Sequence, residues 1–176
     1  DEEVEDLLGA RIRLGQRRKD ICMPFAQEPT FLCEFGGHFC IEEFRPLSPL
    51  PMIDFIAEMD RYLARQTFGK VGLLGTDTVM ETRFYGGIKS TEVLVPPSDV
   101  IPKVHRAYVG MALDARVTDE QRSVMFEQGK ALTERGAEAI LLGGTDLFLA
   151  FDGHDPGFAT LNCAKVHIDA IARQAS

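Results

Sequence analysis

Short, almost uninterrupted apolar runs constrain the fold of this chain more than any other feature of its sequence. Residues 71–75 (Val-Gly-Leu-Leu-Gly) and 139–142 (Ala-Ile-Leu-Leu) contain no polar side chain, and weaker runs lie at 30–33 and 92–95. A strand without polar side chains has no face to turn to water, which is typical of a parallel sheet covered by helices on both faces. We therefore predict the fold class α/β, with parallel strands at 30–33, 71–75, 92–95 and 139–142.

Helices are predicted between these strands from apolar periodicity and capping residues. The strongest signal is Thr118-Asp-Glu-Gln121, a capping box that opens a helix ending at Gly136. Thr76 or Asp77 can cap a short helix after the 71–75 run. The predicted helices cover residues 3–16, 39–44, 55–66, 76–83, 98–115, 118–136 and 163–173, and residues 50–54 are assigned a short strand.

Three predicted loops hold the residues expected at a ligand site. Ligands of parallel sheets bind beyond the carboxyl ends of the strands, which brings together residues 34–38, 76–80 and 143–146. The turns at Thr76 and Thr145 offer hydroxyls and backbone amides to a carboxylate. Asp77 and Asp146 oppose an anion at the same two turns. The loops therefore predict a site for a small acidic molecule.

Charge and cysteine content argue against several other classes of protein. The net charge of −8 disfavours nucleic acid and anionic membrane surfaces as partners, because both favour basic patches. The longest apolar stretch, residues 139–151, is broken by two glycines and an aspartate and is shorter than the ~20 residues that span a bilayer. The acidic N-terminus does not have the character of a signal or transit peptide. Four cysteines without a Cys-x-x-Cys pair indicate reduced thiols and a cytoplasmic protein.

Four segments resemble motifs of the aspartate/glutamate racemase family, the Asp/Glu/hydantoin racemases. Residues 70–76 (Lys-Val-Gly-Leu-Leu-Gly-Thr), with Met80-Glu81 and Phe84-Tyr85 after them, resemble the start of the family's second lobe. Residues 136–147 (Gly-Ala-Glu-Ala-Ile-Leu-Leu-Gly-Gly-Thr-Asp-Leu) resemble its Gly-Cys-Thr-Glu-Leu signature. Residues 32–38 and 161–167 are similar to its Cys-Asn-Thr-X-His and Phe-Asp-Thr-Thr-X-X-His elements. The resemblance covers residues 30–176.

The resemblance implies two Rossmann-like α/β lobes with the substrate between them. It assigns residues 1–69 to the remainder of a first lobe, incomplete at its N-terminus, residues 70–160 to a second lobe, and residues 161–176 to a C-terminal helix that returns to the first. It further implies a dimeric amino-acid racemase that acts on a small acidic amino acid or dicarboxylate. Such an isomerase uses neither pyridoxal phosphate nor a metal.

The family's two proton carriers, normally cysteine thiols, match Glu34 and Gly144 in this chain. Removing a Cα proton needs a base on one face of the substrate and an acid on the other, and Gly144 has no side chain to serve. Cys163 is a further nearby thiol. The candidate catalytic residues are Glu34 and His167, and the candidate substrate-binding residues are Gly36, Thr76, Gly144 and Thr145.

Each candidate residue also has a purely structural interpretation. Glu34 suits a solvated loop carboxylate, Gly36 a tight turn, and Thr76 and Thr145 helix caps. His167 suits a half-buried histidine, and Cys163 a small buried hydrophobe. A cluster of Cys33, His38 and Cys40 does not have the spacing of a standard zinc site, so no metal is predicted.

Three functions are therefore compatible with the sequence. The first is a cofactor-independent racemase of a small acidic amino acid with a changed pair of proton carriers. The second is a catalytically inactive relative that retains the carboxylate-binding cleft. The third is a decarboxylase or isomerase of the same fold that needs a single base.

Overall fold

The computed structural model describes residue 41, residues 45–48 and residues 52–174 of the chain. Within these residues, four parallel strands form one sheet in the order β2-β1-β3-β4. Their bounds are Lys70–Gly75 for β1, Glu92–Leu94 for β2, Ala139–Gly143 for β3 and Thr160–Asn162 for β4. The predicted α/β class and the parallel strands at 71–75, 92–95 and 139–142 are confirmed. The strand predicted at 30–33 lies outside the described residues.

Helices lie on the connections between the strands, because parallel neighbours cannot be joined by a tight turn and need a crossover. Their bounds are Phe55–Gln66 for α4, Asp77–Glu81 for α5, Ile101–Asp114 for α6, Asp119–Glu134 for α7 and Cys163–Gln174 for α8, with short 3-10 helices η3 at Arg45–Leu47 and η4 at Leu147–Ala150. The capping box is confirmed: the Thr118 hydroxyl accepts from the Gln121 backbone N–H, and the Gln121 side chain accepts from the Thr118 backbone N–H.

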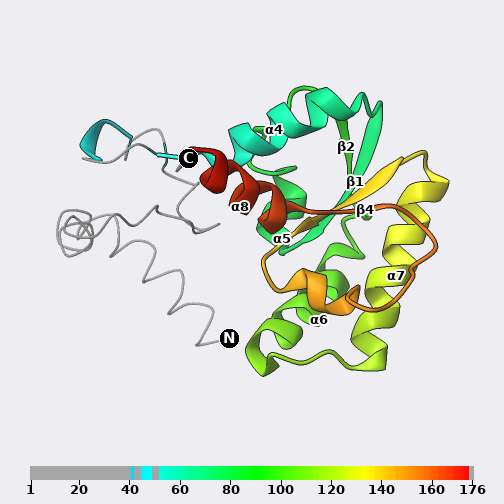
Figure 1. Cartoon of the computed structure of the whole chain (residues 1–176). Helices are drawn as coiled ribbons and strands as arrows, with labels where there is room; N and C mark the ends of the chain where they lie inside the picture. Colours follow the sequence, from blue (N-terminus) through cyan, green and yellow to red (C-terminus); the bar gives the residue numbers. More distant parts are fainter. Residues whose placement is uncertain (1–40, 42–44, 49–51, 175–176) are drawn as a thin grey trace.

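The sheet is covered on both faces, as predicted (Figure 1). Helices α4 and α8 pack over the face that carries Val71, Leu73 and Leu141. Helices α6 and α7 pack over the opposite face, which carries Leu74, Ile140 and Leu142. These six strand side chains are at most 2% exposed, which explains why residues 71–75 and 139–143 are apolar at every position.

Two short segments differ from the sequence predictions. Residues 52–54 form no strand, because Asp54 instead caps α4, its carboxylate accepting from the Ile56 and Ala57 backbone N–H groups at 3.0 Å. The edge strand β4 was not predicted, because its three residues are all half-buried and carry no apolar run. The helices predicted at 3–16 and 39–44 fall on residues that are not described, apart from residue 41.

The helix after β1 also ends earlier than predicted. α5 stops at Glu81, and the following residues Arg83, Phe84 and Tyr85 have φ angles of 48°, 61° and 56°. A left-handed conformation costs non-glycine residues roughly 1–2 kcal/mol each. Here the turn is held by the Phe84 N–H, which donates to the Val79 carbonyl at 2.9 Å, and it buries the Phe84 side chain completely.

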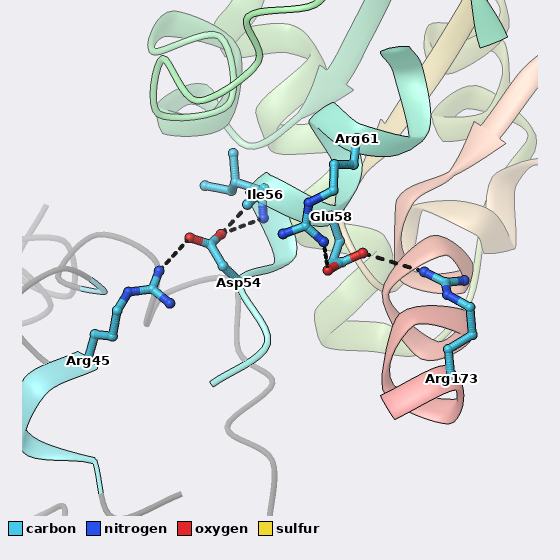
Figure 2. A network of polar contacts seen from close by, with 7 residues as sticks. Arg45, Asp54, Ile56, Glu58, Arg61 and Arg173 are labelled. Atoms are coloured by element: carbon cyan, nitrogen blue, oxygen red, sulfur yellow. Dashed lines mark hydrogen bonds and ion pairs between the residues drawn. The ribbon is translucent and has the colours of Figure 1, made fainter. Parts of the chain in front are cut away.

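A buried carboxylate joins α4 to the end of α8 (Figure 2). The Glu58 side chain is only 7% exposed, and its two oxygens face Arg61 on the same helix and Arg173 of α8, the latter at 3.4 Å. Both arginines remain more than half exposed. At the start of α4, Arg45 makes a 3.0 Å ion pair with Asp54. The first set of ion pairs therefore joins the end of α8 to α4, and the second joins η3 to the start of α4.

In the described part of the chain, no helix combines the length and the apolar character needed to cross a bilayer.

The Glu58 ion pairs make a testable contribution to stability. Replacing Arg61 and Arg173 together with alanine leaves a buried carboxylate without its countercharges, so we expect the free energy of unfolding to fall by about 1–3 kcal/mol. Adding Glu58→Gln should recover part of this loss, because a neutral amide needs no countercharge. Urea unfolding of the three proteins measures both effects. A triple variant no more stable than the double variant would contradict this interpretation.

Candidate functional site

The candidate site begins where the two central strands end. Gly75 of β1 lies opposite Gly143 of β3, and each backbone leaves no room for a side chain on the other. A Cβ atom at Gly75 would lie 2.9 Å from the Gly143 carbonyl oxygen, and one at Gly143 would lie 2.9 Å from the Leu74 carbonyl oxygen. The loops that leave these strands therefore start side by side, and they carry Thr76 and Gly144.

The first loop is fixed by its own cap and by a side chain of α6. The Thr76 hydroxyl accepts from the Val79 N–H at 3.3 Å, which confirms it as the N-cap of α5. The Asp77 N–H donates to Nδ1 of His105 at 3.0 Å, and the same ring nitrogen lies 3.3 Å from the Asp77 carboxylate. The Asp77 carboxylate accepts a hydrogen bond from the Thr78 backbone N–H, with an N–O distance of 2.6 Å.

The second loop has a glycine whose side-chain space is already filled. A Cβ atom placed on Gly144 would overlap the hydroxyl oxygen of Tyr108, and it would lie 2.5 Å from Cζ and 3.1 Å from Cε1 of the same ring. Tyr108 extends from α6 and is only 8% exposed. A side chain at position 144 therefore requires the tyrosine ring to move.

The phenol of Tyr108 is held in its neutral form. Burial raises its pKa above the ordinary value, and the negative charge of Asp146 raises it further. Hydrogen bonding from the Asp146 backbone and the Thr145 side chain acts in the opposite direction without reversing the shift. At neutral pH the Tyr108 oxygen therefore carries a proton and is a donor as well as an acceptor.

Thr145 and Asp146 complete the second loop at the surface. Thr145 is exposed, and its hydroxyl donates to the Asp146 carboxylate at 3.1 Å. The side chain of Asp146 makes no capping hydrogen bond to η4. With Asp77, it places a second carboxylate beside the ends of β1 and β3.

His167 and Cys163 have their side chains in the layer of α4 and α8, although Cys163 directly follows β4 and so starts at the same edge of the sheet as these loops. Both are on α8, which packs against α4 and β3. His167 is 3% exposed, and its ring lies 5.1 Å from the ring of Phe55. Cys163 has no exposed surface, and burial raises the pKa of its thiol far above the ordinary value. A thiol held in this way does not ionise near neutral pH.

The structure brings three of the six predicted site residues to one edge of the sheet: Thr76, Gly144 and Thr145. It places His167 inside the helical layer of α4 and α8. Glu34 and Gly36 lie outside the described residues. No group of three or more His, Cys, Asp and Glu side chains is arranged to hold a metal within the part of the chain that is described.

Two residues at this edge were not predicted from the sequence. His105 and Tyr108 are three positions apart on α6, so they project from the same face of the helix, and they reach the first and second loops respectively. Their spacing in the sequence was visible, but nothing in the sequence indicated which loops that face meets.

The burial of Cys163 predicts an inert thiol. In the native protein, iodoacetamide should label Cys163 many times more slowly than a free cysteine at pH 8, and labelling should become fast once urea unfolds the chain. Mass spectrometry of the peptide that contains residue 163 follows this thiol separately from the other cysteines. Rapid labelling under native conditions would show that the thiol is accessible and ionised.

The chain is similar in sequence and in fold to proteins of one known family. The sequence profile of the Asp/Glu/hydantoin racemases matches residues 32–171. Among solved structures, an aspartate racemase homologue from Pyrococcus horikoshii superimposes with a TM-score of 0.66 at 20% sequence identity, over 80% of this chain and 63% of the other. A proposed Asp/Glu racemase from Yersinia pestis gives a TM-score of 0.73 at 23% identity, over 81% of this chain and 64% of the other.

These two structures establish the fold, and the chain spans just under two thirds of the length of either. The family profile covers both candidate loops and most of α8. From this profile match, and from the fold that accompanies it, the chain belongs to the Asp/Glu/hydantoin racemase family.

Proposed function

We propose that the protein binds a small acidic amino acid where the loops after β1 and β3 meet, and that it acts on the Cα proton without a cofactor. The observation that carries this proposal is the backbone contact between Gly75 and Gly143. It aligns Thr76 with Gly144 and Thr145, the residues expected to bind substrate. Membership of the racemase family supports the same reaction class.

The charges at the edge favour an amino acid over a plain dicarboxylate. The Thr76 oxygen accepts from a backbone N–H, so its own hydrogen is directed elsewhere and can serve a ligand carboxylate. Asp77 and Asp146 repel a second anionic group at this place but attract an ammonium group. Aspartate or glutamate supplies both charges, whereas malate and succinate lack the ammonium.

The chemistry proposed for the site uses a single base. Within residues 52–174, Cys163 is buried and un-ionised, and Tyr108 is neutral, so neither is suited to abstract a proton. Glu34, on the segment that precedes β1, is the candidate base, and we propose that this segment completes the cleft as part of the first lobe. One base on one face exchanges the Cα proton mainly with retention of configuration.

The buried thiol of Cys163 and the neutral phenol of Tyr108 also favour a second candidate function. A protein with no thiol carrier at position 144 can retain the binding cleft and lack catalysis altogether. Binding without exchange of the Cα proton would identify this non-catalytic relative. Rapid inversion of either enantiomer would instead require a second proton carrier, a role for which neither Cys163 nor Tyr108 is suited.

Calorimetry tests the binding site directly. L-Aspartate or L-glutamate should release or absorb heat on binding, and malate should bind more weakly. Thr76→Val, which removes the hydroxyl and keeps the shape, should weaken binding by about tenfold, the loss of roughly one hydrogen bond. Thr76→Ser keeps the hydroxyl and is the matched control. No heat and no thermal shift with any of these acids would refute the proposed site.

Proton exchange tests the proposed chemistry. In D₂O, NMR should show the Cα proton of the bound amino acid being replaced while chiral analysis shows little inversion. Glu34→Gln should abolish the exchange, because losing a positioned base costs about 10²–10⁴-fold in rate. Fast racemisation by the unaltered protein, at a rate equal to its exchange, would contradict a one-base reaction.

A further inference from the structure

We propose that the hydroxyl of Tyr108 takes the place of a side chain at position 144 and donates a hydrogen bond to the acidic ligand. The proposal rests on the proposed function, because it assigns a further residue to the same site. It concerns a side chain of α6 that reaches the strand ends from the layer behind them. Three properties of Tyr108 carry it: where its oxygen lies, its protonation, and its rigid support.

The position of the oxygen is the first property. The space that a Cβ atom of Gly144 would occupy overlaps the Tyr108 hydroxyl. The hydroxyl therefore lies where the first atom of any residue-144 side chain would start, directly beside the backbone that continues to Thr145. Because residue 144 is a glycine, the phenol of Tyr108 has room beside the second loop. The phenol hydroxyl then supplies a polar group at a position where residue 144 has no side chain.

The protonation of the phenol decides what that group can do. The Asp146 backbone is placed to hydrogen-bond to the oxygen and occupies one acceptor position, while the Thr145 hydroxyl, which also reaches the phenol, directs its own hydrogen to the Asp146 carboxylate. Burial and the Asp146 charge keep the proton on the oxygen at neutral pH. The remaining function of the group is to donate, and a carboxylate is the strongest acceptor that a small acidic ligand offers.

The support of the ring is the third property. Val104 and Met111 on the same side of α6 are fully buried, so the helix is anchored to the sheet on both sides of Tyr108. One turn earlier, His105 accepts from the Asp77 N–H and ties α6 to the first loop. Helix α6 therefore sets both the spacing between the two loops and the position of the phenol relative to them.

Ligand binding by conservative variants tests the donor role. Tyr108→Phe removes the oxygen and keeps the ring, and it should weaken binding of L-aspartate or L-glutamate by about tenfold. Its unfolding midpoint without ligand should fall only by the loss of the phenol's own hydrogen bonds at Asp146 and Thr145, and the stabilisation produced by ligand should shrink in addition. Tyr62→Phe is the control, because Tyr62 is a half-buried tyrosine of α4 on the opposite face of the sheet. It should bind normally.

A stability cycle tests the shared space without any ligand. Gly144→Ala should lower the urea midpoint of the unaltered protein, because the new Cβ atom overlaps the phenol. In a Tyr108→Leu background, which has no atom at that place, Gly144→Ala should have less than half of this effect. Equal losses in both backgrounds would show that the hydroxyl does not occupy the side-chain space of residue 144, and would overturn the proposal.

The outcomes separate this proposal from the proposed function. If the unaltered protein binds and Tyr108→Phe binds equally well, the donor role is wrong and the proposed function stands. If the unaltered protein binds none of the acids, the proposed function and the donor role are both refuted. A loss confined to Tyr108→Phe, together with a coupled stability cycle, supports the assignment of Tyr108.

Discussion

The two central strands, β1 and β3, pair in register to their last residues, Gly75 and Gly143. Neither position has room for a side chain, because the backbone of the adjacent strand is too close. With Gly75 opposite Gly143, a methyl group on either residue would press on a carbonyl oxygen of the adjacent strand at 2.9 Å. Because backbones in a packed interior do not yield easily, this contact fixes where both loops begin. Helix α6 then spans the two loops, His105 meeting the first and Tyr108 the second. The candidate site therefore depends on one strand contact and one helix face.

The polar side chains at the ends of β1 and β3 differ in chemistry and exposure from the thiol buried between α4 and α8. The edge has a capping hydroxyl at Thr76, a neutral phenol at Tyr108 and two carboxylates, Asp77 and Asp146. Cys163, which directly follows β4, is buried in the layer of α4 and α8, and burial suppresses the ionisation of its thiol. Neither Cys163 nor Tyr108 ionises near neutral pH, and the carboxylates of Asp77 and Asp146 are assigned to the ligand's ammonium group, so we assign binding and charge stabilisation to this edge. This is why we assign the base to the segment before β1.

Local patterns in the sequence were sufficient to predict much of the fold. Fully buried parallel strands must be apolar throughout, so residues 71–75 and 139–142 were recognisable, and the Thr118 capping box marked the start of α7 from hydrogen-bonding groups three residues apart. The edge strand β4 has no such pattern because it is half-buried and three residues long. That Thr76, Gly144 and Thr145 meet at one edge was predictable because parallel strand ends share an edge. The place of Tyr108 at this edge was not, since it arises from a contact between residues that are distant in the chain.

The central claim is that an acidic amino acid lies against Gly144 with the Tyr108 hydroxyl as its partner. A crystal structure of the protein with bound aspartate or glutamate measures this most directly. Our account predicts a ligand carboxylate oxygen at about 2.5–3.0 Å from the Tyr108 oxygen, with the ring still filling the side-chain space of Gly144 and Thr76 within reach of the ligand. A ligand bound away from both loops, or a tyrosine ring turned out of that space, would contradict it.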